Sequence, residues 1–448
     1  MKIFFINRFF DPDQSATSRM TSSLAFALAS AGWTVHVITS RQLYDDPKAN
    51  LPGLATNRGV IIHRVLSFRF GRMQLLGRLF DYLSFYAAAS WRLWRLAARG
   101  DVAVAGTDPP LFSVCAAFVN RLTGMRLINW LQDLFPEVAS ALRIKGCGRW
   151  LGRGLSAMRD VSLRCAEANV VPGEGMASYL SRRGIPEERI WIRHNWSDGT
   201  KVRPVAPDEN ELRREWHLLD KFVVGYSGNM GRAHDFTTII AAAAVLKQRS
   251  DIVFLLVGQG QHRPWIEEQV QRQDLVNVVL QPFQPEARLS ESLSVPDVHL
   301  VSLRPELEGF VVPSKFYGAA AAGRGVLFIG NSGGEMGRLV KAGCCGAVVA
   351  EGDPLALREW ILRLREAPET CATWGRNARA LFEAQFDQQA AFASWRRLLA
   401  AIEHQPLPVR GLFGPAAAAN AAWPNAQARG LVPTAPIVPT DTPERIGY

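Results

Sequence analysis

The stretch FVVGYSGNMGRAHDFTTIIAAAAVLK, residues 222–247, contains one complete unit of the expected fold. It opens with an apolar run at Phe222 to Tyr226, passes through a polar loop at Ser227 to Asp235, and ends in a helical pattern that reaches Lys247. An apolar strand that leads through a polar loop into an apolar helix is typical of a parallel α/β unit.

The N-terminus shows the same order of elements. Lys2 to Ile6 is an apolar run, residues 7–17 are polar, residues 18–31 have a helical pattern, and Thr34 to Thr39 alternates as a strand does. Ser18 is expected to cap the helix and Gly32 to end it. The second half of the chain therefore repeats the opening of the first.

Further apolar runs, separated by helical stretches, continue both halves. They lie at 59–65, 102–105, 127–130 and 169–171, and again at 252–257, 278–280, 298–301, 326–329 and 347–349. This pattern predicts an α/β protein with two Rossmann-like, doubly wound domains that face a cleft. Because ligands of such sheets bind outside the carboxyl ends of the strands, the candidate site lies in the loops after residues 6, 105, 130, 226, 257, 301 and 329.

The domain boundaries follow from the same pattern. We place the first domain at 1–196 and the second at 197–382, joined near the polar segment 197–219. An amphipathic helix from Asp387, its N-cap, to Glu403 closes the globular part, within a last segment that we place at 383–404. Residues 405–448 are rich in Pro, Ala and Gly, so we expect a disordered tail without a catalytic role.

Composition sets broad limits on function. The chain has 448 residues, of which 48% are hydrophobic and 21% charged, and a net charge of +10. The charge favours an acidic partner such as nucleic acid, an anionic membrane or a phosphorylated substrate, without choosing among them. No helix-turn-helix, zinc or RNP-type motif supports nucleic acid, so we expect none as a partner.

Localisation is predicted from the cysteines and the N-terminus. The six cysteines show no C-x-x-C pair and no metal-ligand spacing, which suits structural thiols in a reducing compartment. The first apolar run is about four residues long, too short for a signal peptide. No uncharged apolar stretch reaches the roughly 18 residues that span a bilayer, and we expect a cytoplasmic protein.

The segment ELEGFVVPSKFYGAAAAGR, residues 306–324, carries the clearest chemistry. It follows a strand and opens a helix near Pro313 or Ser314, where free backbone N–H groups make an anion site. Lys315 adds a positive charge where a diphosphate would lie. The alternative is a capped core helix with a solvated lysine.

At this motif the chain resembles the family-4 retaining glycosyltransferases of capsule, O-antigen and exopolysaccharide biosynthesis, whose pattern is P-S-K-x-Y-x-x-x-A-A-G-R. The resemblance covers about residues 1–400. It rests on ordered blocks: PDQSATSR (12–19), TDPPL (107–111), QDLFPE (132–137), VPGEGM (171–176), HNW (194–196), YSGNMGRAHD (226–235), VGQG (257–260) and GGE (333–335).

The resemblance implies the GT-B fold and retaining transfer from a nucleotide-sugar, without metal or cofactor. The donor would bind the second domain, and the resemblance weakly favours a UDP-sugar over sugars of other nucleotides. A polyprenyl-diphosphate-linked or saccharide acceptor would bind the first domain. Lys315 and Arg232 are the candidates that stabilise the departing diphosphate. Donor contacts are also implied for Ser15 in the opening loop, and for Gly228 and Pro313 with Ser314.

Three positions depart from the broader family. Where the family has an Arg after the strand glycine and a Lys five residues later, this chain has Asn229 and His234. The family has two glutamates eight residues apart. Gly318 occupies the place aligned with the second, and Glu308 stands for the first with a shifted spacing. These departures keep open a non-catalytic nucleotide-sugar or polyanion-binding protein on the same scaffold. A protonated His234 would hydrogen-bond phosphate.

Other candidate residues follow strands. Asp133 is either a carboxylate that orients or deprotonates the acceptor hydroxyl, or a cap of the next turn. Gly258 and Gly260 would let a nucleotide approach the backbone, and Phe283 either flanks the base or joins the core. Gly334 and Glu335 begin a helix that offers N–H donors to phosphate, or form a simple turn. NAD is excluded because Arg263 replaces the third glycine of G-x-G-x-x-G.

Residues 63–99 combine many arginines with aromatic residues and a single acid, Asp81. This composition is typical of a surface that lies on anionic lipid. We therefore expect peripheral association with the cytoplasmic face of the inner membrane, which would bring the enzyme to a lipid-linked acceptor. The alternative is a domain helix with a solvated basic edge. The residues that would contact membrane or acceptor are Arg78, Trp91, Arg92, Trp94 and Arg95.

Overall fold

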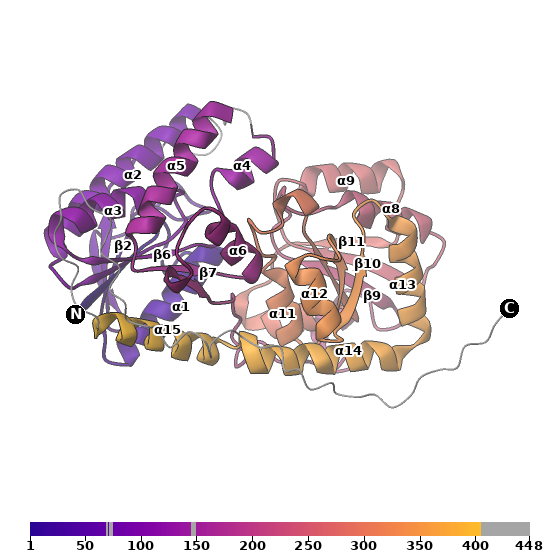
Figure 1. Cartoon of the computed structure of the whole chain (residues 1–448). Helices are drawn as coiled ribbons and strands as arrows, with labels where there is room; N and C mark the ends of the chain where they lie inside the picture. The colour runs from indigo at the N-terminus through magenta and orange to yellow at the C-terminus, as the bar shows by residue number, and fades with distance from the viewer. Residues whose placement is uncertain (69, 71–74, 145–148, 405–448) are drawn as a thin grey trace. The chain divides into compact units, whose positions relative to one another are not determined.

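The computed structural model describes residues 1–404 except 69, 71–74 and 145–148 (Figure 1). The predicted tail, 405–448, lies outside the described residues. Within them the chain forms two open α/β sheets covered by helices, one from each half. The predicted fold class is confirmed.

The first sheet has eight strands in the order β3-β4-β2-β1-β5-β6-β7-β8. All neighbours are parallel except β3 and β4, which are antiparallel. The central strands are buried on both faces, which explains their continuous apolar runs. The bounds are β1 (Lys2–Ile6), β2 (Thr34–Ser40), β3 (Leu54–Asn57), β4 (Val60–Val65), β5 (Val102–Ala105), β6 (Arg126–Trp130), β7 (Ala168–Val171) and β8 (Ile190–Ile192).

Six α-helices connect these strands. They are α1 (Ala16–Ser30), α2 (Leu75–Leu96), α3 (Phe112–Thr123), α4 (Glu137–Ala141), α5 (Arg149–Cys165) and α6 (Glu174–Arg182). A 3-10 turn at Glu187–Arg189 precedes β8. The first helix begins two residues earlier than predicted because Ser15, not Ser18, has the extended backbone of an N-cap. Ser18 is instead buried inside the helix.

The second sheet has six parallel strands in the order β11-β10-β9-β12-β13-β14. They are β9 (Phe222–Ser227), β10 (Ile252–Val257), β11 (Val278–Gln281), β12 (Val298–Ser302), β13 (Gly325–Ile329) and β14 (Gly346–Val349). The helices are α7 (Glu211–Glu215), α8 (Thr237–Val245), α9 (Arg263–Arg272), α10 (Leu289–Ser294), α11 (Lys315–Ala321), α12 (Glu335–Ala342), α13 (Pro354–Glu366) and α14 (Pro368–Leu381). Short turns lie at Glu286–Arg288, Pro305–Leu307 and Phe382–Phe386.

The predicted connecting segment 197–219 is partly built into the second sheet's layer. Leu212 and Leu218 are buried against β9 and β10, and Arg213 forms an ion pair of 3.0 Å with Asp297. The segment is therefore a structural part of the second half. The domain boundaries themselves stay a prediction.

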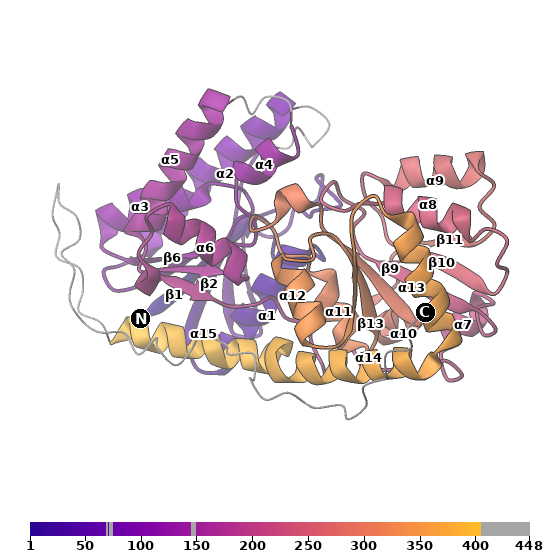
Figure 2. The ribbon, with the colours of Figure 1, turned by 45° about the vertical axis from the view of Figure 1, so that its right-hand side comes forward.

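The C-terminal helix returns to the first sheet. Helix α15 (Gln388–Glu403) begins at Asp387, whose carboxylate accepts a hydrogen bond from the Gln389 N–H at 2.9 Å. Its Trp395 ring meets Trp130 of β6 edge-on at 5.0 Å, and the helix lies beside α1 (Figure 2). Asp387 is confirmed as the N-cap and Glu403 as the end of the helix, and a π-turn at Phe382–Phe386 precedes it.

Strand order places two switch points. In the first sheet β1 lies between β2 and β5, and in the second β9 lies between β10 and β12. The connections leave in opposite directions there, which opens a crevice at the carboxyl ends of the strands. The loops after β1, β5, β9 and β12 are therefore the places to look for a ligand site. Among the described helices, none has both the length and the apolarity to cross a membrane.

Candidate donor and acceptor site

Lys315 lies at the start of α11, directly above the second switch point. Its Nζ is 2.8 Å from Nε2 of His234 and 5.3 Å from the ring centre of Tyr226, the last buried residue of β9. Pro313 before it is buried, whereas Ser314 is exposed and makes no side-chain capping bond. Because α11 has only seven residues, the positive charge of Lys315 contributes more to an anion site here than the helix dipole.

His234 is neutral and accepts a hydrogen bond from Lys315. Nδ1 of His234 lies 2.7 Å from the carbonyl oxygen of Ser302, so this nitrogen carries the proton and Nε2 accepts from the Lys315 ammonium. Burial, with a contribution from Lys315, lowers the pKa of His234 to about 3. The protonated imidazole that the sequence suggested for phosphate binding is therefore not available near neutral pH. The ring positions the lysine.

The Lys315 ammonium has no negatively charged group among its described contacts. It is mostly enclosed by protein, and this desolvation lowers the pKa of its ammonium to about 7. Its described contacts are a neutral imidazole and an aromatic ring, neither of which carries a negative charge. A diphosphate at this place would supply the missing counter-charge and raise the pKa again.

This arrangement predicts that nucleotide affinity falls as pH rises. Above pH 7 the free protein has lost the Lys315 proton, and binding must restore it. We expect the affinity for UDP to fall about tenfold per pH unit over the window above the free-enzyme pKa. Calorimetry in two buffers with different ionisation enthalpies measures the proton uptake. The control is Lys315→Arg, because an arginine keeps its charge over this range; equal pH slopes in both proteins would contradict the prediction.

Glycines bring the loops after β9 and β10 together. Gly228, Gly258 and Gly260 all have positive φ, at 137°, 141° and 147°. A Cβ on Gly258 would lie 2.1 Å from the Gly228 carbonyl oxygen, and one on Gly228 would lie 2.9 Å from Cε of Lys315. These glycines therefore allow the two loops and Lys315 to approach one another, in addition to any role with a nucleotide.

The remaining donor candidates on these loops face solvent. Asn229 and Arg232 are both exposed, and the charge of Arg232 contributes to the lowered pKa of His262. Phe283 is 52% exposed, and its Cε1 lies 3.4 Å from a Cβ position on Gly258. The core alternative for Phe283 is therefore wrong. Its place beside the glycine loop leaves the ring free to flank a base.

The carboxylate of Glu308, in the loop before α11, contacts the N-terminus of α12. Its Oε1 accepts a hydrogen bond of 2.6 Å from the Glu335 N–H, and a Cβ on Gly334 would meet the same carboxylate. In this structure that N–H is therefore occupied by a carboxylate, so its role toward phosphate stays a prediction. Oε2 of Glu308 is buried and has no hydrogen-bond partner among the described residues. It is an acceptor that a sugar hydroxyl could satisfy.

Glu335 reaches across to the first half of the chain. Its carboxylate accepts the Gly175 N–H at 2.9 Å, at the start of α6, and burial raises its pKa. A Cβ on Gly173 would lie 1.9 Å from Oε1 of Glu335. Glu335 thus joins a loop of the second sheet to a helix N-terminus of the first, a contact between distant segments that the sequence did not reveal.

Asp133 meets the loop that leads to Lys315. It forms an isolated antiparallel bridge with Val311, and the adjacent Leu134 N–H donates to the Phe310 carbonyl at 3.0 Å. Asp133 is exposed at the surface, but much protein lies around its carboxyl. This desolvation raises the pKa of its carboxyl, against the lowering effect of a hydrogen bond from Thr107. The two halves therefore bring Asp133 to the same loop as Glu308 and Lys315.

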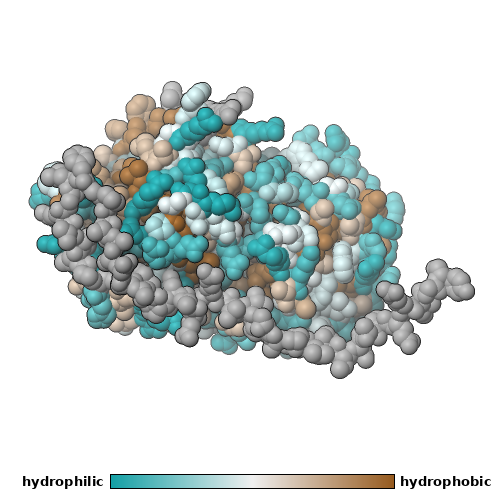
Figure 3. Space-filling model, viewed as in Figure 1, coloured by the Kyte–Doolittle hydropathy of each residue, from teal (hydrophilic) through white to brown (hydrophobic). Residues whose placement is uncertain are grey.

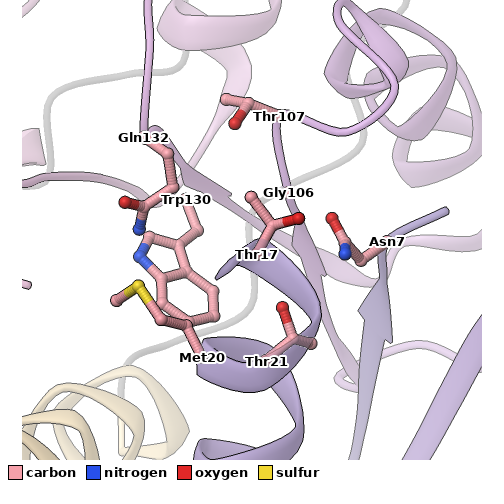
Figure 4. A pocket seen from close by; sticks show the side chains of 8 residues that line it. All are labelled: Asn7, Thr17, Met20, Thr21, Gly106, Thr107, Trp130 and Gln132. Atoms are coloured by element: carbon pink, nitrogen blue, oxygen red, sulfur yellow. The ribbon is translucent and has the colours of Figure 1, made fainter. Parts of the chain in front are cut away.

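A small recess opens beside Gln132, the residue before Asp133, at the switch point of the first sheet (Figure 4). Figure 4 shows Gln132, Thr107 and Asn7 around it, with the Trp130 ring at one side. Nε2 of Gln132 is buried without a hydrogen-bond partner among the described residues. The recess therefore offers a free amide N–H donor next to an aromatic ring, a combination that suits a sugar. It is lined by Asn7, Thr17, Met20, Thr21, Gly106, Thr107, Trp130 and Gln132.

Sequence reasoning placed the loops after β1, β5 and β6 at the candidate site, but it did not single out Asn7 or Thr107. Asn7 and Thr107 each follow a strand, at β1 and β5, and that position was the available signal. Ser15 lies close to the recess in sequence, at the start of α1, but its hydroxyl and N–H both donate to Asp13. Its contact with a donor stays a prediction.

The predicted membrane residues lie on α2. Trp91 and Trp94 are 60% and 44% exposed, Arg95 is exposed, and Arg92 is half-buried. Arg78 also belongs to α2, but its side chain is outside the described residues. Arginine and large apolar side chains are both exposed on this helix, so the membrane contact and the alternative of a domain helix with a solvated basic edge both stay predictions.

Two families match the chain, one over each half. Residues 15–196 match the glycosyl transferase 4-like domain, and residues 208–381 match glycosyl transferases group 1. The first match covers the sheet with the recess apart from β1 and Asn7, and the second covers the sheet with Lys315.

Similar proteins carry related names. WcaI of Escherichia coli K12, named as a glycosyl transferase of colanic acid biosynthesis, is 25% identical over 384 residues, which cover 82% of this chain and 92% of WcaI. WbjE of Pseudomonas aeruginosa, named as a glycosyltransferase, is 25% identical over 272 residues, covering 61% of this chain and 68% of WbjE.

Solved structures agree on the fold. Sucrose-phosphate synthase from Thermosynechococcus elongatus has a TM-score of 0.70 at 19% identity, and HepE of Anabaena, solved with UDP and glucose, has 0.67 at 17%. Each match covers 90% of this chain and 100% of the other. With both halves matched in order, the chain belongs to the family-4 glycosyltransferases of the GT-B fold.

Proposed function

We propose that this glycosyltransferase moves a sugar, with retention at the anomeric carbon, from a UDP-sugar to a lipid-linked or saccharide acceptor in surface polysaccharide biosynthesis. The observation that carries the proposal is the His234-held Lys315, a cation without a counter-charge at the switch point of the second sheet. Such a cation stabilises the charge that develops on a departing diphosphate.

The donor is proposed to bind the second half without a metal ion. Lys315 neutralises the diphosphate, Arg232 adds a mobile charge at the exposed edge, and Phe283 flanks the base. Glu308, through its unpaired Oε2, accepts a hydroxyl of the transferred sugar. UDP is favoured because HepE was solved with UDP and glucose, and a trehalose-6-phosphate protein of Escherichia coli was solved with UDP-2-fluoro glucose.

The acceptor is proposed to bind the first half, in the recess beside Gln132, the residue before Asp133. Trp130 and Gln132 offer an apolar wall and an unsatisfied amide to a sugar, and Asp133 accepts the proton of the attacking hydroxyl. A polyprenyl-diphosphate-linked acceptor agrees with the exposed tryptophans on α2, which we propose lie on the cytoplasmic face of the inner membrane.

A thermal-shift series tests the donor site. We expect UDP to raise the melting temperature more than GDP, CDP, dTDP or NAD, since ligand binding to the folded state stabilises it. The shift should vanish in Lys315→Ala and persist in Lys341→Ala, a lysine of α12 that bonds only Ser332 among its described contacts. No shift with any nucleotide in the wild type would rule out the donor site proposed here.

The second candidate is a non-catalytic binding protein on the same scaffold. The positions that favour it are Asn229, His234 and Gly318, where the broader family has charged residues. Both candidates bind a nucleotide-sugar. Only the enzyme releases UDP faster when an acceptor is added, and this release decides between them.

A further inference from the structure

The loop at 308–314 belongs to the second half of the chain but packs on the first. The side chain of Phe310 joins an apolar cluster of the first half, which includes Leu134 and Leu180. Its ring meets Tyr179 of α6 edge-on, with the ring centres 5.1 Å apart and the planes at 87°. This is a favourable arrangement for two aromatic side chains. A side chain from the second half is thus part of the packing of the first.

The backbone of this loop contacts the same part of the first half. The carbonyl oxygen of Phe310 accepts a hydrogen bond of 3.0 Å from the Leu134 N–H. Val311 forms the isolated bridge with Asp133. Gly309 has a φ of 79°, and a Cβ there would lie 3.4 Å from a carbonyl oxygen of α6. Three consecutive residues of the loop therefore lie against the first half.

The aromatic pair is an internal contact. Phe310 and Tyr179 are both partly buried against the cluster. In the space-filling view, hydrophilic and neutral residues prevail around α6 (Figure 3). The pair therefore joins two parts of this chain, and it is not an exposed apolar patch that awaits a further partner.

Tyr179 is itself held in place on the first half. Its hydroxyl donates to Oε1 of Glu137 at 2.7 Å, and Glu137 forms an ion pair with the buried Arg159. Arg159 also pairs with Asp160 at 2.8 Å. A buried polar network whose members are paired in this way is rigid. Tyr179 therefore offers Phe310 a fixed surface.

The loop joins groups of both proposed sites. Glu308, just before Gly309, belongs to the donor site, and its Oε1 accepts a hydrogen bond from the N-terminus of α12. Asp133, on the acceptor side, is bridged to the middle of the same loop. Lys315, beyond the end of the loop, is held separately by His234 within the second half. A shift of the loop would therefore separate Glu308 from Asp133 and leave the Lys315 contact in place.

We propose that Phe310 is a positioning residue that aligns the donor sugar with the acceptor. Seated on Tyr179, it fixes the loop, and the fixed loop holds Glu308 and Asp133 at the distance that transfer needs. The proposal rests on the proposed function, because Phe310 acts through residues assigned there. It deepens that function, since contact with the first half, and not the second sheet alone, then determines where the sugar lies.

The test separates nucleotide binding from transfer. In Phe310→Ala, His234 still holds Lys315, so the thermal shift with UDP should persist. The kcat for transfer should fall by about 10²-fold, as it does when reacting groups are misplaced by about 1 Å. Tyr179→Ala removes the same contact from the other half and should have a similar effect. Tyr179→Phe keeps the ring and should retain most of the rate.

A double variant tests whether the two rings act together. If their contact is the cause, Phe310→Ala with Tyr179→Ala should lose no more kcat than the larger single loss, because changes to residues in direct contact are not additive. Losses that multiply would mean that the two side chains act independently, and would overturn the proposal.

Hydrogen–deuterium exchange tests the contact without an activity assay. Peptides that contain Leu134 should exchange faster in both alanine variants, since its N–H would lose a stable acceptor. The matched control is Trp360→Ala, whose ring pairs with Trp374 at 5.7 Å inside the second half. This control should leave both kcat and the exchange of these peptides unchanged.

The outcomes separate this proposal from the proposed function. A wild type that binds UDP but transfers no sugar would refute the proposed function and, with it, any role of Phe310 in transfer. A wild type that transfers sugar while Phe310→Ala does so equally fast would overturn only the positioning role. Unchanged exchange at Leu134, or a loss of the UDP shift along with kcat, would also overturn it. If Phe310→Ala melts at a much lower temperature without ligand, Phe310→Leu, which keeps an apolar side chain, takes its place in each measurement.

Discussion

Replacing Lys315 by alanine should lower the rate of sugar transfer by about 10² to 10³-fold, the range found when one preorganised charge-stabilising donor is removed. The described contacts of Lys315, a histidine and an aromatic ring, include no acid. Its loss leaves the departing diphosphate with backbone N–H groups and the exposed Arg232. Steady-state kinetics with a UDP-sugar and acceptor measure the effect.

Gly228→Ala provides an independent check on Lys315. A Cβ there would lie 2.9 Å from Cε of Lys315, at a φ of 137° that a side chain rarely adopts. It should displace the lysine and reproduce part of the kinetic loss while the positive charge is retained. His234→Phe, which removes the acceptor at 2.8 Å, should act in the same direction more weakly. Transfer by Lys315→Ala at the wild-type rate would contradict the role assigned to this residue.

The sequence predicted most strands because burial on both faces leaves continuous apolar runs. β1, β5 and β10 have the predicted bounds, and the other predicted strands each differ by one residue. β3 was missed since Leu54–Asn57 is an edge strand with alternating exposure and no apolar run. β8 was missed because Ile190–Ile192 has only three residues.

The contacts within the site could not be predicted in the same way. Lys315 and His234 were both donor candidates, but their pairing depends on β12 lying beside β9, across 81 residues of sequence. Glu335 bonds to Gly175 across 160 residues. The sequence showed which residues follow strands, whereas the neighbour of each one is determined by strand order, which local patterns do not encode.

Replacing Asp133 by asparagine should lower transfer by about 10² to 10⁴-fold, the usual contribution of a positioned acid or base, and leave the thermal shift with UDP in place. Asparagine is similar in size but cannot take a proton from the acceptor hydroxyl. Because Asp133 lies on the first half and Lys315 on the second, the two variants separate the steps: one loses chemistry and the other also loses nucleotide binding.

The pH profile gives the sharper form of this prediction. Burial raises the pKa of Asp133, so its basic form is lost as pH falls through a value above that of an ordinary aspartate. Activity should decline on this acid limb, and the limb should be absent from the residual activity of Asp133→Asn. Thr107→Val removes the hydrogen bond that lowers this pKa, and should move the limb to higher pH. If Asp133 only caps a turn, Asp133→Asn will instead lower the melting temperature and leave both the rate and the acid limb unchanged.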